Sequence, residues 1–188
     1  MNNGTKEVHL LDEEAFEKKF RSLLSSAQEF AIATALLTVD GLKIIQPEIE
    51  KGLRRGARGG ARLKWGKIII GLDMRGTDPK ALATLLRLAG KSKGALAVRV
   101  FHQESRGIFH SKMAVFQENK TWSGILGSSN LSQGGFSRNV ETNVLLDNSG
   151  DCKALLKRFH RYWLNSECRD LSKETLALAT ELYRPVEP

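Results

Sequence analysis

Short apolar runs that alternate with helix-like segments constrain the fold of this chain more than any other feature of its sequence. Runs of strand length are FAIATALLT at 30–38, KIIIGL at 67–72 and LAVRVF at 96–101. The segments between and after these runs place apolar residues at helical spacing. Helices are therefore expected at 12–28, 42–58, 80–89, 151–164 and 171–183. Strands that alternate with helices predict an α/β fold, here a mixed β-sheet sandwiched between helices.

Pro47 complicates the second of these helices, because proline lacks the N–H that a helix interior requires. Either Pro47 lies in the first turn of this helix, or it separates the segment LKII at 42–45 from the rest. The sequence leaves both arrangements open.

The 188 residues suit a single domain that spans 1–188. No apolar run approaches the roughly 18 residues of a membrane-spanning helix, and the N-terminal segment lacks the apolar core of a signal peptide. We therefore expect a cytoplasmic protein with no membrane contact, or a domain of a larger helicase or restriction enzyme. Cys152 and Cys168 lack metal-ligand spacing, so buried thiols are expected rather than a zinc site or a disulfide framework.

A polar pair interrupts the apolar run IFHSKMAVF at 108–116, which otherwise has the composition of a buried strand. Residues two apart on a strand share a face, so His110 and Lys112 should point in the same direction. Burying an imidazole and an ammonium group together costs several kcal/mol unless another group compensates them. A site that binds an anion would supply that compensation.

Two later segments provide companions for this pair. ILGSSN reads as a short strand at 125–127 that ends in Ser128, Ser129 and Asn130, and NVETNVLL at 139–146 reads as another strand with Glu141 on one face. Hydroxyl, amide, ammonium and imidazole groups together suit a phosphate group. A carboxylate such as that of Glu141 can orient the imidazole and stabilise its cation.

In these residues the chain resembles the phospholipase D superfamily, and within it the small single-motif nucleases and the nuclease domains of restriction enzymes. The resemblance rests on His110-x-Lys112, on GSSN at 127–130 and on Glu141, eleven residues after Asn130. Gln117 stands where the family motif usually carries Asp. The resemblance implies the sandwich fold described above and a hydrolase that cleaves phosphodiester bonds, in particular a DNA endonuclease.

The resemblance also implies a mechanism. His110 would attack phosphorus and form a phosphohistidine, while Lys112, Asn130 and Ser128 hold the non-bridging oxygens and Glu141 orients His110. A second His110 would protonate the leaving oxygen, so a chain with one motif would act as a homodimer that shares its active site. No metal and no other cofactor is expected. The strand ends near Ile108 and Ile125 and the aromatic ring of Phe136 are expected at the interface.

Positive charge is concentrated in the middle of the chain, where residues 51–112 carry 15 basic and 3 acidic side chains. This distribution favours a nucleic-acid partner, DNA in preference to RNA. The predicted contacts are Arg54, Arg55, Arg58, Arg62 and Lys64. The alternative is a solvated surface in which these cations simply suit the C-terminus of a helix.

Two other functions remain open from the sequence. A lipid phosphodiesterase would share the chemistry, but it should carry an apolar or amphipathic stretch that docks on a membrane. A non-catalytic nucleic-acid-binding module would keep the basic segment, and Gln117 is the feature that favours it. His102 and His160 are expected to be a surface histidine and a structural histidine. Sequence specificity is not encoded in any recognisable pattern.

Overall fold

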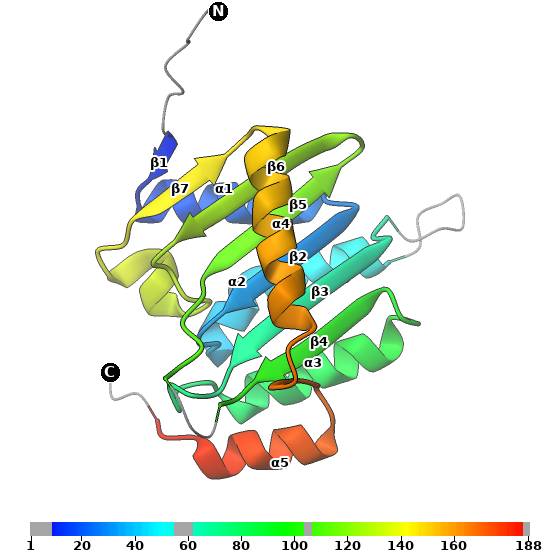
Figure 1. The fold of residues 1–188 in the computed structure, drawn as a ribbon, viewed down its shortest axis with the longest axis vertical. Coiled ribbons are helices and arrows are strands. Elements are labelled where there is room, and N and C mark those ends of the chain that lie inside the picture. The colour runs from blue at the N-terminus through cyan, green and yellow to red at the C-terminus, as the bar shows by residue number, and fades with distance from the viewer. Residues whose placement is uncertain (1–8, 55–61, 104–106, 186–188) are drawn as a thin grey trace, which may run out of the picture.

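The computed structural model describes residues 9–54, 62–103 and 107–185. Its strands form one mixed sheet in the order β1-β7-β6-β5-β2-β3-β4-β8 (Figure 1). The strands are β1 (His9–Leu11), β2 (Glu29–Thr34), β3 (Trp65–Gly71), β4 (Leu96–Phe101), β5 (Met113–Glu118), β6 (Thr121–Gly127), β7 (Asn143–Leu146) and β8 (Cys168–Asp170). The helices are α1 (Glu13–Ser26), α2 (Val39–Leu53), α3 (Pro79–Lys91), α4 (Ser149–Trp163) and α5 (Lys173–Leu182), with one π-helical turn, η1 (Gly134–Arg138). The predicted α/β class is confirmed.

The directions of the strands define two ends of the sheet. β2, β3 and β4 are parallel, whereas β5, β6 and β7 are antiparallel to their neighbours. One end, here called the motif end, therefore gathers the last residues of β2–β4, the first residues of β5 and β7, and the last residue of β6. The opposite end, here called the basic end, holds Arg54 after α2 and Lys64 before β3.

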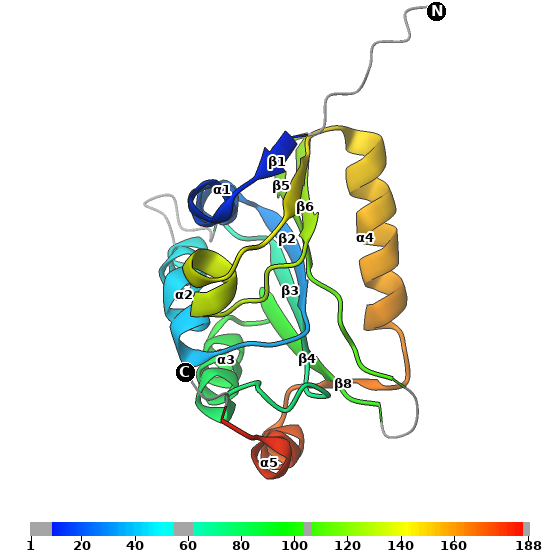
Figure 2. The same cartoon turned by 90° about the vertical axis from the view of Figure 1, so that its left-hand side faces the viewer.

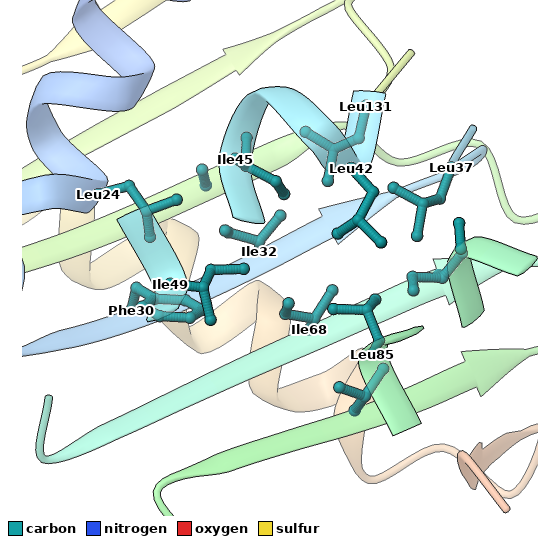
Figure 3. Packing of buried hydrophobic residues seen from close by; sticks show 14 of the residues in the cluster. Leu24, Phe30, Ile32, Leu37, Leu42, Ile45, Ile49, Ile68, Leu85 and Leu131 are labelled. Atoms are coloured by element: carbon teal, nitrogen blue, oxygen red, sulfur yellow. The ribbon is translucent and has the colours of Figure 1, made fainter. Parts of the chain in front are cut away.

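Helices cover both faces of the sheet, as Figure 2 shows. α1, α2 and α3 lie on one face, and among the described helices α4 lies by itself against the other. On the first face, Leu42, Ile45 and Ile49 of α2 pack at helical spacing against Ile32 and Ile68 of the central strands (Figure 3). Because both faces are covered, the central strands are apolar on both sides, which explains their continuous apolar runs.

The second helix differs from either arrangement expected from Pro47. α2 begins at Val39 and ends at Leu53, so Pro47 lies well inside an unbroken helix. Its N-terminus is capped by Thr38, whose Oγ1 accepts a hydrogen bond from Gly41 N at 3.1 Å. Apolar residues buried on both sides of Pro47 hold the helix together despite the missing hydrogen bond. Tertiary packing therefore overrides the local signal.

Two predicted strands begin later than expected. The run at 108–116 becomes a strand only from Met113, and the run at 139–146 only from Asn143. The segment before β5 is not paired as a strand at Phe109, because Phe109 N donates to the Asp73 side chain rather than to a neighbouring strand. His110 and Lys112 therefore do not share a strand face: His110 is exposed and Lys112 is buried.

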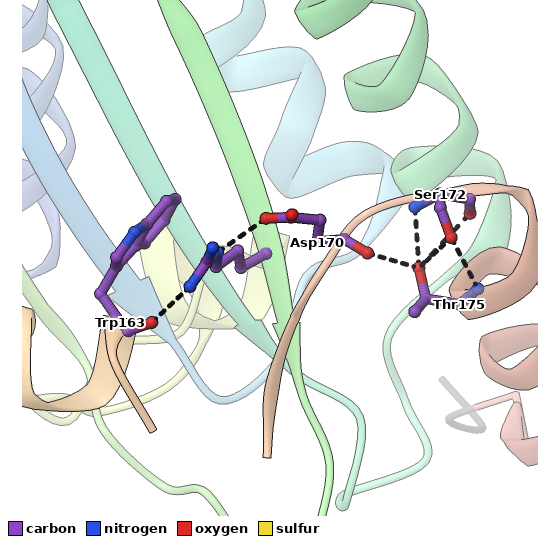
Figure 4. A network of polar contacts seen from close by, with 5 residues as sticks. Trp163, Asp170, Ser172 and Thr175 are labelled. Atoms are coloured by element: carbon purple, nitrogen blue, oxygen red, sulfur yellow. Dashed lines mark hydrogen bonds and ion pairs between the residues drawn. The ribbon is translucent and has the colours of Figure 1, made fainter. Parts of the chain in front are cut away.

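The outer strands β1 and β8 were not predicted, because three residues give no periodic signal. β8 is held by side chains, as Figure 4 shows. Arg99 of β4 donates to Asp170 Oδ1 at 2.7 Å and to the carbonyl of Trp163 at 2.6 Å. Asp170 O in turn accepts from Thr175 Oγ1 at 3.1 Å, which ties β8 to α5.

None of the described helices is long and apolar enough to cross a membrane.

Candidate active site

The motif residues meet at the motif end of the sheet although they come from three separate segments. His110 and Lys112 precede β5, the GSSN segment follows β6, and Glu141 precedes β7. Backbone hydrogen bonds join these segments: Gly127 N donates to Lys112 O at 3.3 Å, and Ser128 N donates to Thr142 O at 3.0 Å. The antiparallel order β5-β6-β7 thus brings the predicted catalytic residues into one region.

Lys112 is the buried cation of this region, with 8% of its surface exposed. Its Nζ donates to the carbonyl of His110 at 3.1 Å. Burial lowers the pKa of Lys112, and the nearby carboxylate of Glu141 opposes that shift by attraction. A cation that has been stripped of water attracts an anion more strongly than a solvated one, so Lys112 is suited to bind a phosphate oxygen.

Three buried polar side chains share a small, otherwise apolar cavity with Lys112, and sequence reasoning gave two of them, Thr34 and Asn143, no role. Thr34, Ser129 and Asn143 line a cavity of about 20 Å³ with Lys112. Asn143 Nδ2 donates to Ser129 Oγ at 2.8 Å, and Asn143 Oδ1 accepts from Ser129 N at 3.4 Å. The sequence signal was present, since Thr34 and Asn143 are polar residues inside apolar runs.

Asn130 is held in place by its own backbone and by a neighbouring hydroxyl. Thr34 Oγ1 lies 3.4 Å from Asn130 Oδ1 and accepts a hydrogen bond from Leu131 N at 3.2 Å. A Cβ atom at Gly135 would lie 2.3 Å from Asn130 O, so η1 packs directly on the Asn130 backbone. Only glycine permits this approach, which gives Gly135 a structural purpose.

Ser128 lies close to Glu141, because Ser128 is hydrogen-bonded to the backbone of Thr142, the residue that follows Glu141. Ser128 Oγ accepts from Thr142 N at 2.9 Å, and its own donation to Thr142 O is long, at 3.4 Å. The hydroxyl hydrogen can therefore turn to a better acceptor on a ligand. Asn139 Nδ2 donates to Glu141 Oε1 at 3.2 Å and orients that carboxylate. The structure groups Ser128, Asn130 and Glu141 around the segment that carries His110 and Lys112.

The prediction for Phe136 is wrong. Phe136 has 0% of its surface exposed and stacks on Phe16 of α1, with ring centroids 5.2 Å apart. It also meets Phe20 edge-to-face at 5.7 Å. Its ring belongs to the core between η1 and α1, where its whole surface is removed from water within one chain. It cannot form a dimer contact.

The structure does not bring the predicted nucleic-acid-binding residues to His110. Arg54 and Lys64 lie at the basic end, separated from the motif end by β3, which spans about 20 Å at roughly 3.3 Å per residue. Arg55 and Arg58 fall outside the described residues. Arg62 has two buried guanidinium nitrogens without a hydrogen bond within the described part of the chain, so it is poorly presented to a phosphate.

The structure also shows where Gln117, His102 and His160 lie. Gln117 lies toward the basic end of β5, so the departure from the family motif is remote from His110. His102 is not a surface histidine: its Nδ1 lies 2.8 Å from Asp73 Oδ1, and 15% of its side chain is exposed. His160 is partly buried. Its pKa is lowered mainly by this burial and, to a smaller extent, by repulsion from Lys67.

The two cysteines are buried free thiols, as expected. Burial raises the pKa of Cys152 and that of Cys168 to about 11 each, which keeps both protonated and unreactive at neutral pH. Within residues 9–54, 62–103 and 107–185, no three His, Cys, Asp or Glu side chains come together as a metal site would require.

A family model described as the cardiolipin synthase, PLD-like domain matches residues 21–163. No match was found among curated proteins. Nuc from Salmonella typhimurium, a phospholipase D family member, is similar with a TM-score of 0.60 and 18% identity, over 87% of this chain and 98% of that one. Phosphatidylserine synthase from Haemophilus influenzae Rd KW20 is similar with a TM-score of 0.63 and 16% identity, over 94% of this chain and 41% of that one. TrmBL2, an archaeal chromatin protein whose structure shows a novel mode of DNA binding, is similar with a TM-score of 0.54 and 17% identity. The match covers 87% of this chain and 54% of that one.

At these identities the solved structures demonstrate a shared fold. The family model says more, because it spans most of the chain and includes every motif residue of the site. Thr34, Ser129 and Asn143, which line a cavity with Lys112, fall within the matched range as well. The chain therefore belongs to the phospholipase D superfamily, through its PLD-like domain.

Proposed function

We propose that this chain is a nuclease that hydrolyses phosphodiester bonds in DNA, in preference to RNA, through a phosphohistidine at His110. One observation carries the proposal: His110 is exposed, and the buried ammonium of Lys112 donates to the His110 carbonyl at 3.1 Å. The imidazole is accessible to a phosphate, and the desolvated cation is suited to the charge that develops on its oxygens.

The proposed chemistry proceeds in two displacements at phosphorus. His110 attacks the phosphate, a P–N bond forms, and the P–O bond to the leaving group breaks as that oxygen receives a proton from a second imidazole. Water then gives a proton to the same imidazole and attacks phosphorus, which breaks the P–N bond and releases His110. Lys112, Asn130 and Ser128 hold the non-bridging oxygens, and Glu141 stabilises the imidazolium of His110.

The second imidazole is proposed to come from a second copy of the chain. Beside His110 the described histidines are His9, His102 and His160, and none of them has a lysine two residues later. Exposed apolar side chains at the motif end support a self-complementary contact: Ile108 is 52% exposed and Val140 is 98% exposed. Because Phe136 is internal, these two residues replace it as the proposed apolar contacts.

A nucleic-acid substrate is proposed on the basis of charge. The net charge of the chain is +8, and part of its positive charge lies on exposed side chains of α4. These cations are Lys153, Lys157, Arg158 and Arg161. The similar solved structures do not decide the substrate, since one is described as binding DNA and another as a phosphatidylserine synthase.

The decisive experiment is an assay on labelled duplex DNA, single-stranded DNA and RNA, run in parallel with vesicles that contain cardiolipin or phosphatidylserine. The expected result is cleavage of DNA that persists in excess EDTA and disappears in His110→Ala, while His9→Ala remains active. Sedimentation should give a mass near twice the 20.9 kDa of one chain. Turnover of the lipids without cleavage of nucleic acid would reject the proposal. Loss of cleavage in EDTA with recovery in magnesium would reject its mechanism.

A further inference from the structure

We propose that Asp73 is a positioning residue for catalysis, because it anchors the segment that presents His110. Asp73 follows β3 at the motif end and belongs to none of the motifs that mark the site. Its side chain is 3% exposed. A carboxylate buried to this degree is costly unless several donors satisfy it, so its partners indicate its purpose.

The Asp73 carboxylate accepts hydrogen bonds from both sides of the connection between β4 and β5. Oδ1 accepts from Gln103 N at 2.9 Å and lies 2.8 Å from His102 Nδ1. Oδ2 accepts from Phe109 N at 2.8 Å. A single side chain thus fixes the residues just after β4 and the residue just before His110.

Other contacts of Phe109 point to the same role. The Phe109 ring stacks on Phe101 with centroids 4.6 Å apart and meets Tyr162 of α4 edge-to-face at 5.3 Å. Gly71 leaves space for this ring, because a Cβ atom there would lie 3.2 Å from Phe109 Cδ1. Phe109 is therefore fixed at both its amide and its ring.

The geometry leaves His110 fixed at its backbone and exposed to solvent. Asp73 and the aromatic contacts fix the residue before it, and Lys112 Nζ donates to the His110 carbonyl at 3.1 Å. An exposed nucleophile gains rate from such fixation, since the imidazole need not be ordered anew when the substrate arrives. Asp73 acts on the reaction through this backbone and does not touch the substrate.

His102 has a supporting part in this arrangement. A carboxylate oxygen accepts hydrogen bonds, so Nδ1 of His102 carries the hydrogen and donates to Asp73. His102 supplies one of the donors that make the buried carboxylate tolerable. Its removal still leaves the amides of Gln103 and Phe109 on Asp73.

The test compares Asp73→Asn with Thr175→Val, and it rests on the proposed phosphodiesterase activity for its kinetic readout. Thr175 is also buried and hydrogen-bonded, but it lies at α5, away from the site. In Asp73→Asn, kcat should fall about 100-fold with KM within roughly twofold, because the amide cannot accept from three donors and a small misplacement of His110 is costly. Thr175→Val should lower Tm but keep kcat at a temperature where both variants are folded.

A second measurement does not depend on activity. Amide hydrogen exchange resolved by NMR should show that Gln103 and Phe109 are protected in the wild type and exchange at least tenfold faster in Asp73→Asn. If the wild type cleaves no phosphodiester, the proposed function fails, and this exchange experiment still tests the anchor. Unchanged exchange at Phe109, or faster exchange with normal kcat, would overturn the role of Asp73.

His102→Ala separates positioning from chemistry. Its kcat should fall less than that of Asp73→Asn, in proportion to the smaller loss of protection at Phe109. If His102→Ala loses as much activity as Asp73→Asn while Phe109 stays protected, then His102 acts directly in the reaction and the positioning account of Asp73 is overturned.

Discussion

The motif end and the basic end of the sheet carry similar kinds of side chain in opposite environments. At the motif end Lys112 is buried, has a lowered pKa and lines a cavity with three buried polar side chains. At the basic end Arg54 and Lys64 are exposed to solvent. The same charge therefore has a different effect at each end, because water screens the exposed cations and not the buried one.

This difference assigns different tasks to the two ends: charge stabilisation during a reaction to the motif end, and long-range attraction of a polyanion to the basic end. A desolvated ammonium held against the backbone of an exposed histidine can stabilise charge that develops during a reaction. Exposed cations about 20 Å away, at roughly 3.3 Å per strand residue, can only attract and orient a polyanion. The motif end should therefore be sensitive to single substitutions, and the basic end should respond in proportion to the charge removed.

The largest effect is expected from a matched pair of lysines. Lys112→Met should lower kcat/KM by about 1,000-fold, the upper range for the loss of one charge-stabilising donor. Its Tm should stay the same or rise, because the substitution removes the desolvation penalty of a buried ammonium. Lys64→Met at the basic end should leave kcat within about twofold, since exposed charges act only at long range. A large fall in Tm for Lys112→Met would mean that Lys112 is mainly structural.

A pair of glycines tests the positioning of Asn130. Gly135→Ala places a Cβ atom 2.3 Å from Asn130 O, so it should shift Asn130, lower kcat about 100-fold and reduce Tm. Gly90→Ala in α3 meets no atom within 4 Å and should raise the free energy of unfolding by up to about 1 kcal/mol without a change in kcat. Chemical denaturation and steady-state kinetics on both variants provide the comparison. Normal activity in Gly135→Ala would remove Asn130 from the site.

The lowered pKa of Lys112 predicts how activity depends on pH. Phosphate binding requires the protonated ammonium, so kcat/KM should fall as pH rises through a pKa below that of an ordinary lysine. Glu141 raises that pKa by attraction, and Glu141→Gln should therefore move the alkaline limb of the profile to lower pH, whatever its effect on the maximum rate. An alkaline limb that stays in place would show that Lys112 does not control it.

The smallest effect is expected at the basic end. Arg54→Ala with Lys64→Ala should weaken binding to duplex DNA and flatten its dependence on salt, by about 0.9 in log–log slope for each phosphate that the protein no longer neutralises. The rate at saturating DNA should not change. Fluorescence anisotropy at several salt concentrations measures the slope. An unchanged slope would return these residues to the alternative of a solvated surface.

The sequence by itself determined the class of fold and the identity of the motif residues. The central strands could be predicted because covered faces demand apolar residues at successive positions, as in FAIA at 30–33 of β2, where all four residues are buried. Helix starts could be predicted where a cap is local, as at Asp12, whose side chain accepts from Ala15 N at 2.8 Å. The spacing of His110, Lys112, Asn130 and Glu141 indicated the superfamily without knowledge of their positions in space.

The tertiary structure alone decided which groups are buried and which donors and acceptors meet. Thr34 bonds to Leu131 across 97 positions of sequence, and Asp73 bonds to Phe109 across 36, so no local pattern shows either pairing. Side-chain partners replace strand pairing ahead of β5, where Phe109 N donates to Asp73, and ahead of β7, where Thr142 N donates to Ser128 Oγ. Packing between η1 and α1 likewise placed Phe136 inside the core. Hydrogen-bond partners and burial depend on segments that only folding brings together, which is why a sequence pattern named the proposed catalytic residues but not the residues that hold them.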